Sequence, residues 1–340
     1  MIARAPRFWW RPPGLLAALL SPVAWRVGRI AAARLAEPPS GAVAVPVVCV
    51  GNLVVGGAGK TPTVAALAAL AADRAPAILV RGYGGSLAGP VRVDPARHGA
   101  AEVGDEALLA AALAPTVAGR DRVAAARLAV EGGAGLILMD DGFQNPALAR
   151  DVAILVVDAA TGVGNGRCLP AGPLRAPVAD QLARADAVLL VGTGAAGEAV
   201  AASAAAAGVA VLRGRLEPVA PERFAGMRAL AFAGIGRPEK FFETLEGCGA
   251  EVAERRSFAD HHPFGEAEAE AILAAADRAG LVPVTTAKDH VRLVGGPARA
   301  ALAARAKILE VRLVPDDPGA FVALIELAAE RAARRISRAP

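Results

Sequence analysis

A glycine-rich segment, flanked by an apolar run and an alanine-rich run, constrains the fold more than any other feature of this sequence. The segment is Val54-Val-Gly-Gly-Ala-Gly-Lys-Thr61, and the preceding run, 44–50, has the composition of a buried strand. Small residues in such a loop let backbone N–H groups approach phosphate oxygens, while Lys60 reaches the β- and γ-phosphates and Thr61 binds Mg²⁺. The alternative is an ordinary glycine turn, which the flanking strand and helix disfavour. We therefore predict a loop that binds ATP and Mg²⁺, formed by Val54 (where the strict motif has glycine), Val55, Gly56, Gly57, Ala58, Gly59, Lys60 and Thr61.

Further apolar runs end in polar or glycine residues, as strands of an open parallel sheet do at the edge where ligands bind. These runs are 77–80, 135–139, 152–157 and 187–191, with helical stretches between them. A second α/β pattern starts near residue 228 and includes an expected strand at 308–314 and a helix at 319–335. The sequence predicts an α/β fold with a P-loop NTPase-like parallel sheet domain, residues 37–225, and a second, smaller α/β domain, residues 226–340, that closes the active-site cleft.

Two adjacent carboxylates, Asp140 and Asp141, follow the apolar run 135–139. A strand that delivers an aspartate beside a P-loop supplies the second half of an NTP–Mg²⁺ site. A strand-to-turn junction, where aspartate is common, is the alternative interpretation. We expect Asp140 and Asp141 to be metal ligands together with Thr61, and the sequence does not decide which carboxylate touches the metal.

Several other polar residues have two interpretations when each is taken alone. Asp105 fits a helix N-terminus, and His261 and His262 fit either a loop-stabilising cluster or a weak metal site. Arg81 and Arg175 stand in glycine- and proline-rich loops, where arginine suits anion binding, although a solvated surface position is as good an explanation. Together with Asn52, which ends the first strand, they are predicted to be substrate or phosphate clamps.

The positive charge of the chain is concentrated in residues 1–36, which form a basic, Trp-rich segment. The rest of the chain has 31 basic and 33 acidic residues, which disfavours nucleic-acid binding. The apolar run 14–25 is too short to cross a bilayer of roughly 30 Å. We expect a helix that lies in the headgroup region, and a helix packed on the protein's own body is the alternative. The segment contains Arg4, Arg7, Arg11, Arg26, Arg29 and Arg34, and the tryptophans Trp9, Trp10 and Trp25.

Taken in order, these motifs resemble the tetraacyldisaccharide 4'-kinase family, the lipid A 4'-kinases. The resemblance spans nearly the whole chain. It rests on 48–62, 81–85, 104–106, 140–144, 164–175, 258–261 and 285–289.

The resemblance implies transfer of the γ-phosphate of ATP to the 4'-hydroxyl of a tetraacylated glucosamine disaccharide 1-phosphate. It also implies a peripheral or monotopic location on the cytoplasmic face of a bacterial inner membrane, with the lipid-linked disaccharide and the cytoplasmic leaflet as partners. No protein partner is inferred. By the same resemblance Asp105 is the catalytic base, assisted by His261.

Three residues depart from the pattern of that family: Ala107, Ala176 and Ala287. Ala176 replaces an acidic residue, which puts one metal contact in doubt. The main alternative function is a membrane-associated switch ATPase of the Gly-Gly-x-Gly-Lys-Thr class, but Val55 stands where that class has lysine. A GTPase is disfavoured because no Asn-Lys-x-Asp motif follows the late strands.

Overall fold

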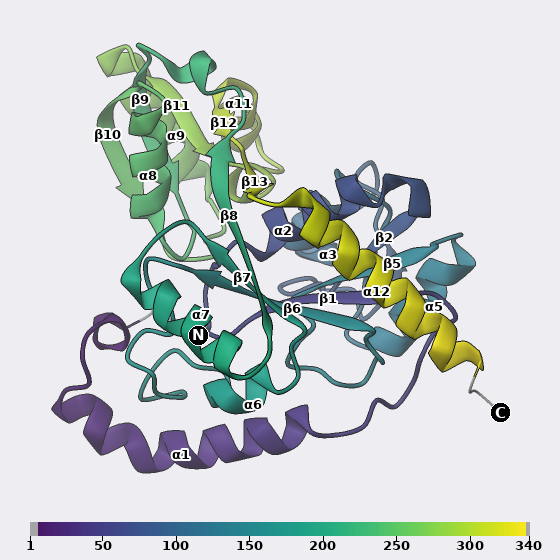
Figure 1. Ribbon diagram of the computed structural model, residues 1–340. Coiled ribbons are helices and arrows are strands. Elements are labelled where there is room, and N and C mark those ends of the chain that lie inside the picture. Colours follow the sequence, from purple (N-terminus) through teal and green to yellow (C-terminus); the bar gives the residue numbers. More distant parts are fainter. Residues whose placement is uncertain (1–5, 338–340) are drawn as a thin grey trace.

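The computed structural model describes residues 6–337 and shows a large α/β domain with a smaller one above it (Figure 1). Arg4, one of the basic residues singled out in the sequence, lies outside the described residues. The predicted fold class is confirmed, since both domains are built on mainly or wholly parallel sheets.

The large sheet contains nine strands within the described range, and the P-loop strand lies near its middle. Its outermost strands pair in an antiparallel manner, whereas the seven between them are parallel. In spatial order the strands are β13 (Val311–Pro315), β8 (Ala210–Pro218), β7 (Ala187–Val191), β6 (Val152–Asp158), β1 (Val47–Asn52), β5 (Leu136–Asp140), β2 (Pro76–Val80), β4 (Thr116–Ala118) and β3 (Val91–Arg92).

Side chains of alternate strand residues build two cores, one on each face of this sheet, as the period of two in a strand requires. Valine, leucine and isoleucine fill the central strands, which are buried along their whole length. The helices of the large domain are α1 (Leu15–Leu35), α2 (Lys60–Leu70), α3 (Ala100–Val103), α4 (Asp105–Ala111), α5 (Arg122–Glu131), α6 (Val178–Leu182), α7 (Ala195–Ala206) and α12 (Pro318–Ser337), with the 3-10 turns η1 (Arg7–Trp10) and η2 (Ala72–Arg74).

The smaller domain is a four-stranded parallel sheet with a helix layer on each face. It is entered through the 3-10 turn η3 (Pro221–Phe224). Its elements are β9 (Arg228–Ala233), α8 (Pro238–Gly247), β10 (Glu251–Ser257), α9 (Glu266–Ala279), β11 (Val282–Thr286), α10 (Ala287–His290), α11 (Pro297–Arg305) and β12 (Lys307–Leu309).

The C-terminal segment corrects the predicted domain division. The single strand expected at 308–314 is two strands, since β12 ends at Leu309 in the small sheet and β13 pairs antiparallel with β8 of the large sheet. Helix α12 then crosses the large sheet beside α2 and buries Phe321 and Ile325 in that core (Figure 1). Residues 311–337 therefore belong with the large domain and not with the small one.

Helix α1 lies along the lower edge of the large domain, beside α6 (Figure 1). Only small or terminal residues of this helix are buried: Ala17, Ala24, Gly28 and Leu35. Among the described residues, α1 is the one helix whose length and composition would allow it to cross a membrane, a criterion that core helices and signal sequences also meet. The tryptophans divide between two environments, because Trp9 is buried and donates from Nε1 to the Pro170 carbonyl (3.0 Å), while Trp25 is exposed.

Candidate active site

The glycine-rich loop connects the end of β1 to the start of α2. Gly56 and Gly59 have φ angles of +110° and +98°, a region that favours glycine and turns the chain so that α2 begins at Lys60. The amide of Asn52 braces the loop, because its Nδ2 donates to the Gly56 carbonyl at 3.0 Å. The loop thus lies at the N-terminus of a helix, where backbone N–H groups attract phosphate.

Asp140 ends β5, the strand next to β1, and faces the start of α2. Its Oδ2 accepts a hydrogen bond from Thr61 Oγ1 at 2.9 Å, while its Oδ1 is buried without a hydrogen-bond partner. Burial raises the pKa of Asp140 to about 6. A buried carboxylate oxygen without a partner, next to a P-loop threonine, is the arrangement that a divalent cation would satisfy.

Asp141 turns away from Thr61 and pairs with cations. Its oxygens accept from both Nη atoms of Arg175 at 3.0 Å, and Lys60 Nζ lies 3.9 Å from Oδ2. Although burial opposes it, Lys60 and Arg175 hold the pKa of Asp141 below its usual value. Asp141 also adopts φ +51°, a strained backbone region for aspartate that is common at functional sites. The two adjacent carboxylates therefore have different environments.

Asp105 and His261 meet across the boundary between the two domains. Asp105 is the first residue of α4, and His261 lies in the loop after β10, with its Nδ1 3.0 Å from Asp105 Oδ2. Gly104 precedes Asp105 with φ +88°, and a Cβ there would lie 2.4 Å from the Tyr83 carbonyl oxygen, so this close approach requires glycine. His261 itself has φ +58°. The side chain of Asp105 is 5% exposed and that of His261 is 30% exposed.

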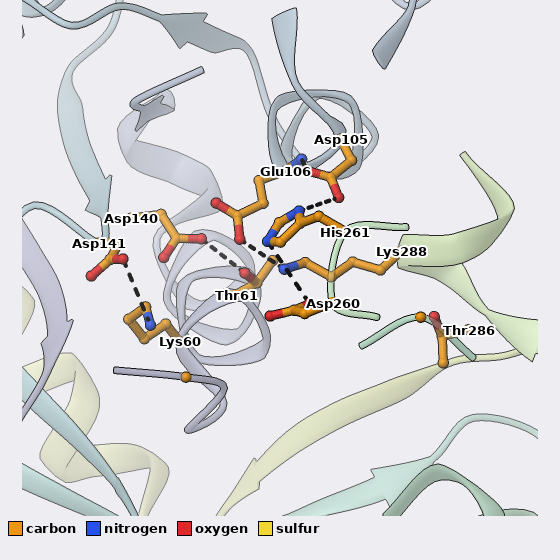
Figure 2. A network of polar contacts seen from close by, with 12 residues as sticks. Lys60, Thr61, Asp105, Glu106, Asp140, Asp141, Asp260, His261, Thr286 and Lys288 are labelled. Carbon is orange, nitrogen blue, oxygen red and sulfur yellow. Dashed lines mark hydrogen bonds and ion pairs between the residues drawn. The ribbon is translucent and has the colours of Figure 1, made fainter. Parts of the chain in front are cut away.

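An ion pair lies between the P-loop and the Asp105–His261 pair. Lys288 Nζ of the small domain is 2.8 Å from Glu106 Oε1 of α4. Glu106 acts electrostatically on both Lys60 and Asp140, and Lys288 acts on Asp105 and Asp260, so the two halves of the site share one electrostatic environment. Figure 2 shows these side chains gathered in one region, with Glu106 paired with Lys288 and with His261 between Asp105 and Asp260.

The family model for tetraacyldisaccharide-1-P 4'-kinase, LpxK, matches residues 16–329 of this chain. The chain belongs to this family. Tetraacyldisaccharide 4'-kinase of Xanthobacter autotrophicus is 54% identical over 337 residues, which cover 96% of this chain and 98% of the relative. That of Methylobacterium sp. (strain 4-46) is 54% identical over 319 residues, 92% of this chain and 94% of the relative.

A solved structure supports the same assignment. LpxK from Aquifex aeolicus, described as an "apo" form in complex with ATP, has a TM-score of 0.72 and 27% identity, covering 93% of this chain and all of that one. The predicted family is confirmed, the chain is a kinase that uses ATP, and the switch-ATPase alternative is not favoured.

Two predicted clamp residues of the kinase are already engaged within the protein. Arg175 pairs with Asp141 and donates from Nε to the Val54 carbonyl at 3.2 Å. These contacts hold the start of the P-loop in place. Asn52 braces Gly56, and its Oδ1 is buried without a partner. Arg81 is exposed and lines a cavity of about 310 Å³ with Tyr83 and Arg120, so its role as a clamp remains a prediction.

The sequence interpretation missed several charged residues of the kinase. Arg292 contacts Asp105, while Arg237, which precedes α8, and Lys240 of α8 contact Asp158 at the end of β6 (2.8 and 3.3 Å). Arg292 follows Asp289 by three residues, the spacing that places two side chains on one face of a helical turn, and this signal was available. No sequence pattern points to Arg237 and Lys240, because their partner belongs to the other domain.

Proposed function

We propose that this kinase transfers the γ-phosphate of ATP to the 4'-hydroxyl of a tetraacylated glucosamine disaccharide 1-phosphate, a step of lipid A biosynthesis. The observation that carries the proposal is the pairing of two half-sites across the domain boundary. The large domain contributes a P-loop with Thr61 and Asp140, and the small domain brings His261 against Asp105. Phosphoryl transfer needs little more than positioning, charge neutralisation and an acceptor for the hydroxyl proton.

Mg²⁺ fits the residues beside the P-loop. Thr61 Oγ1 and Asp140 would be its oxygen ligands, because Asp140 Oδ1 is buried without a partner while Asp141 is occupied by Arg175 and Lys60. Ala176 is buried and offers no ligand atom, and no cluster of three or more His, Cys, Asp or Glu residues suited to a metal is found among the described residues. The remaining ligands would be phosphate oxygens and water, as in other kinase sites. Bound there, Mg²⁺ would neutralise charge on the β- and γ-phosphates.

The geometry favours His261 over Asp105 as the group that takes the hydroxyl proton. Both oxygens of Asp105 are engaged, since Oδ1 accepts from the Glu106 N–H at 2.9 Å and Oδ2 faces His261 and Arg292. With Asp105 ionised, Nδ1–H of His261 donates to it, which leaves Nε2, 3.9 Å from Asp260 Oδ1, as the ring nitrogen that can accept a proton. This arrangement reverses the roles that the family resemblance implies: Asp105 orients His261, and His261 acts as the base.

The exposed face of helix α1 supports attachment of the kinase to a membrane, with the helix lying along the membrane surface. Its outward face exposes large apolar residues, with Leu15, Leu19 and Trp25 79%, 69% and 71% exposed. Its inward face is fixed to the body, because a Cβ at Gly28 would already contact Cys168 Sγ at 3.0 Å. An apolar face outward together with Arg26 and Arg29 is typical of a helix that lies in the headgroup region of an anionic leaflet. We propose that the kinase sits there, on the cytoplasmic face, where its lipid substrate is.

The test is acceptor-dependent consumption of ATP by the purified kinase in detergent. We expect turnover with Mg²⁺ and the disaccharide 1-phosphate to exceed turnover without the disaccharide by orders of magnitude. His261→Gly should be nearly inactive and partly rescued by added imidazole, whereas Asp105→Asn should not be. ATP hydrolysis that is equally fast without the acceptor would contradict the proposal.

A further inference from the structure

Arg292 is a buried arginine that joins the two domains at the Asp105–His261 pair. It follows α10 in the small domain and is 8% exposed. Its Nε donates to Asp105 Oδ2 at 2.8 Å, and its Nη2 donates to the same oxygen and lies 3.4 Å from His261 Nδ1. The guanidinium therefore contacts both members of the pair, and it meets the imidazole ring on the Nδ1 side.

The other side of the guanidinium is fixed by the small domain. Nη1 donates to Asp289 Oδ1 and to the Gly234 carbonyl, both at 2.9 Å. Asp289 is itself held by the Gly234 N–H at 2.9 Å and by Thr286 Oγ1 at 2.6 Å. Because every one of these partners is in the small domain, the direction of Arg292 toward Asp105 is set before the two domains meet.

The charged side chains around Asp105 control whether its carboxyl group is ionised. The charged groups that face it are His261, Arg292 and Lys288, all from the small domain. Behind them, Glu106 pairs with Lys288, Asp289 pairs with Arg292, and Asp260 lies 3.9 Å from His261 Nε2. Burial favours the neutral acid, yet the hydrogen bond from His261 and the charges of Arg292 and Lys288 hold the pKa of Asp105 well below its usual range. Arg292 also separates two buried carboxylates, Asp105 and Asp289, that would otherwise repel each other.

We propose that Arg292 is a positioning residue of the kinase: it keeps Asp105 ionised and aimed at His261, and it completes the pair only when the small domain is docked. This inference rests on the proposed function. It adds a third member to the pair, one that acts through Asp105. An arginine suits this task because its planar fork can bond two carboxylates and a carbonyl at once.

The test compares Arg292→Gln and Arg292→Lys with the wild type. Removing the positive charge of Arg292, which lowers the pKa of Asp105, favours the protonated form of Asp105, so the acid limb of the kcat–pH profile should move up by about one unit or more in Arg292→Gln. We expect kcat to fall by about 10–100-fold, as it does when the hydrogen-bond partner that orients a functional side chain is removed, with little change in KM for ATP. Arg292→Lys keeps the charge but loses the fork, so its acid limb should stay near the wild-type position while kcat is reduced.

Arg299→Gln is the matched control, since Arg299 pairs with Glu266 in the same domain and touches no part of the site. It should keep the wild-type kcat and pH profile. A wild-type acid limb in Arg292→Gln, or a wild-type kcat in Arg292→Lys, would overturn the inference. If Arg292→Gln does not fold, the Arg292→Lys kcat decides alone. Absence of phosphate transfer in the wild type would instead overturn the proposed function, so the two failures are distinguishable.

Discussion

Asp140 offers a prediction in which stability and activity change in opposite directions. Its pKa is raised to about 6 by burial, from an ordinary value of 3.8. The folded, ligand-free protein therefore binds more protons than the unfolded chain between about pH 4 and 6, and stability falls as pH rises through that window. The penalty is complete above pH 6 and amounts to about 3 kcal/mol, at 1.36 kcal/mol for each pKa unit. Asp140→Asn removes this penalty.

We expect Asp140→Asn to stabilise the ligand-free kinase by about 1–3 kcal/mol at pH 8. The gain can be smaller than the full penalty because one buried polar atom of the side chain lacks a hydrogen-bond partner in the variant, as Asp140 Oδ1 does in the wild type. The advantage over the wild type should shrink as the pH falls from 6 to 4. The same variant should lose most kinase activity and most of the stabilisation that Mg²⁺ and ATP give the wild type.

Urea unfolding followed by tryptophan fluorescence is the assay, because all three tryptophans lie in residues 1–36 and report on the large domain alone. Asp141→Asn is the matched control. The pKa of Asp141 is lowered by Lys60 and Arg175, so its charge contributes stability that is present above the unfolded pKa and lost as pH falls. This control should therefore be destabilised at neutral pH. An Asp140→Asn protein that is less stable than the wild type at pH 8, with no dependence on pH, would refute the reasoning.

Three further predictions concern other parts of the site. Lys60→Ala and Thr61→Ala should each remove most activity, and near-normal turnover of Lys60→Ala at saturating ATP would rule out the P-loop assignment. Asp105→Ala and His261→Ala should each lower kcat by roughly 10²–10⁴ with little change in ATP affinity. The loss in the double variant should be far smaller than the product of the two single losses. His262→Ala should be better tolerated, because the His262 ring bonds Glu268. Replacing Leu19 and Trp25 by serine should weaken binding to anionic vesicles, and wild-type binding should fall with salt; equal co-sedimentation of both proteins would contradict the role of α1.

Local patterns made the centre of the large sheet and the P-loop predictable. The buried runs of β1, β5 and β6 are continuous and apolar. Because β1 and β5 are neighbours in the sheet, the loop after β1 and the last residue of β5 bring Thr61 and Asp140 together. Short or half-exposed strands such as β4 and β10 were not found, because three residues carry little signal and an alternating charged pattern resembles loop or helix.

What the sequence did not predict depends on contacts between distant segments. The return of β13 and α12 to the large sheet follows from an antiparallel pairing with β8 and from the burial of Phe321, neither of which has a local signature. The different roles of Asp140 and Asp141 depend on Arg175, 34 residues later in the chain. Arg292 gains its role only through Asp105, 187 residues earlier, and the docking of the domains brings them together.

The most direct test of the account is to identify the product of the wild-type kinase, with ATP and Mg²⁺, acting on purified tetraacyldisaccharide 1-phosphate. We predict a 1,4'-bisphosphorylated lipid, with phosphorus–proton correlation NMR placing the new phosphate on the 4'-oxygen. Its rate of formation should be lowered by Asp140→Asn and by His261→Ala alike, although these residues lie in different domains. Phosphate found only as the free inorganic ion, or a product rate that His261→Ala leaves unchanged, would contradict the account.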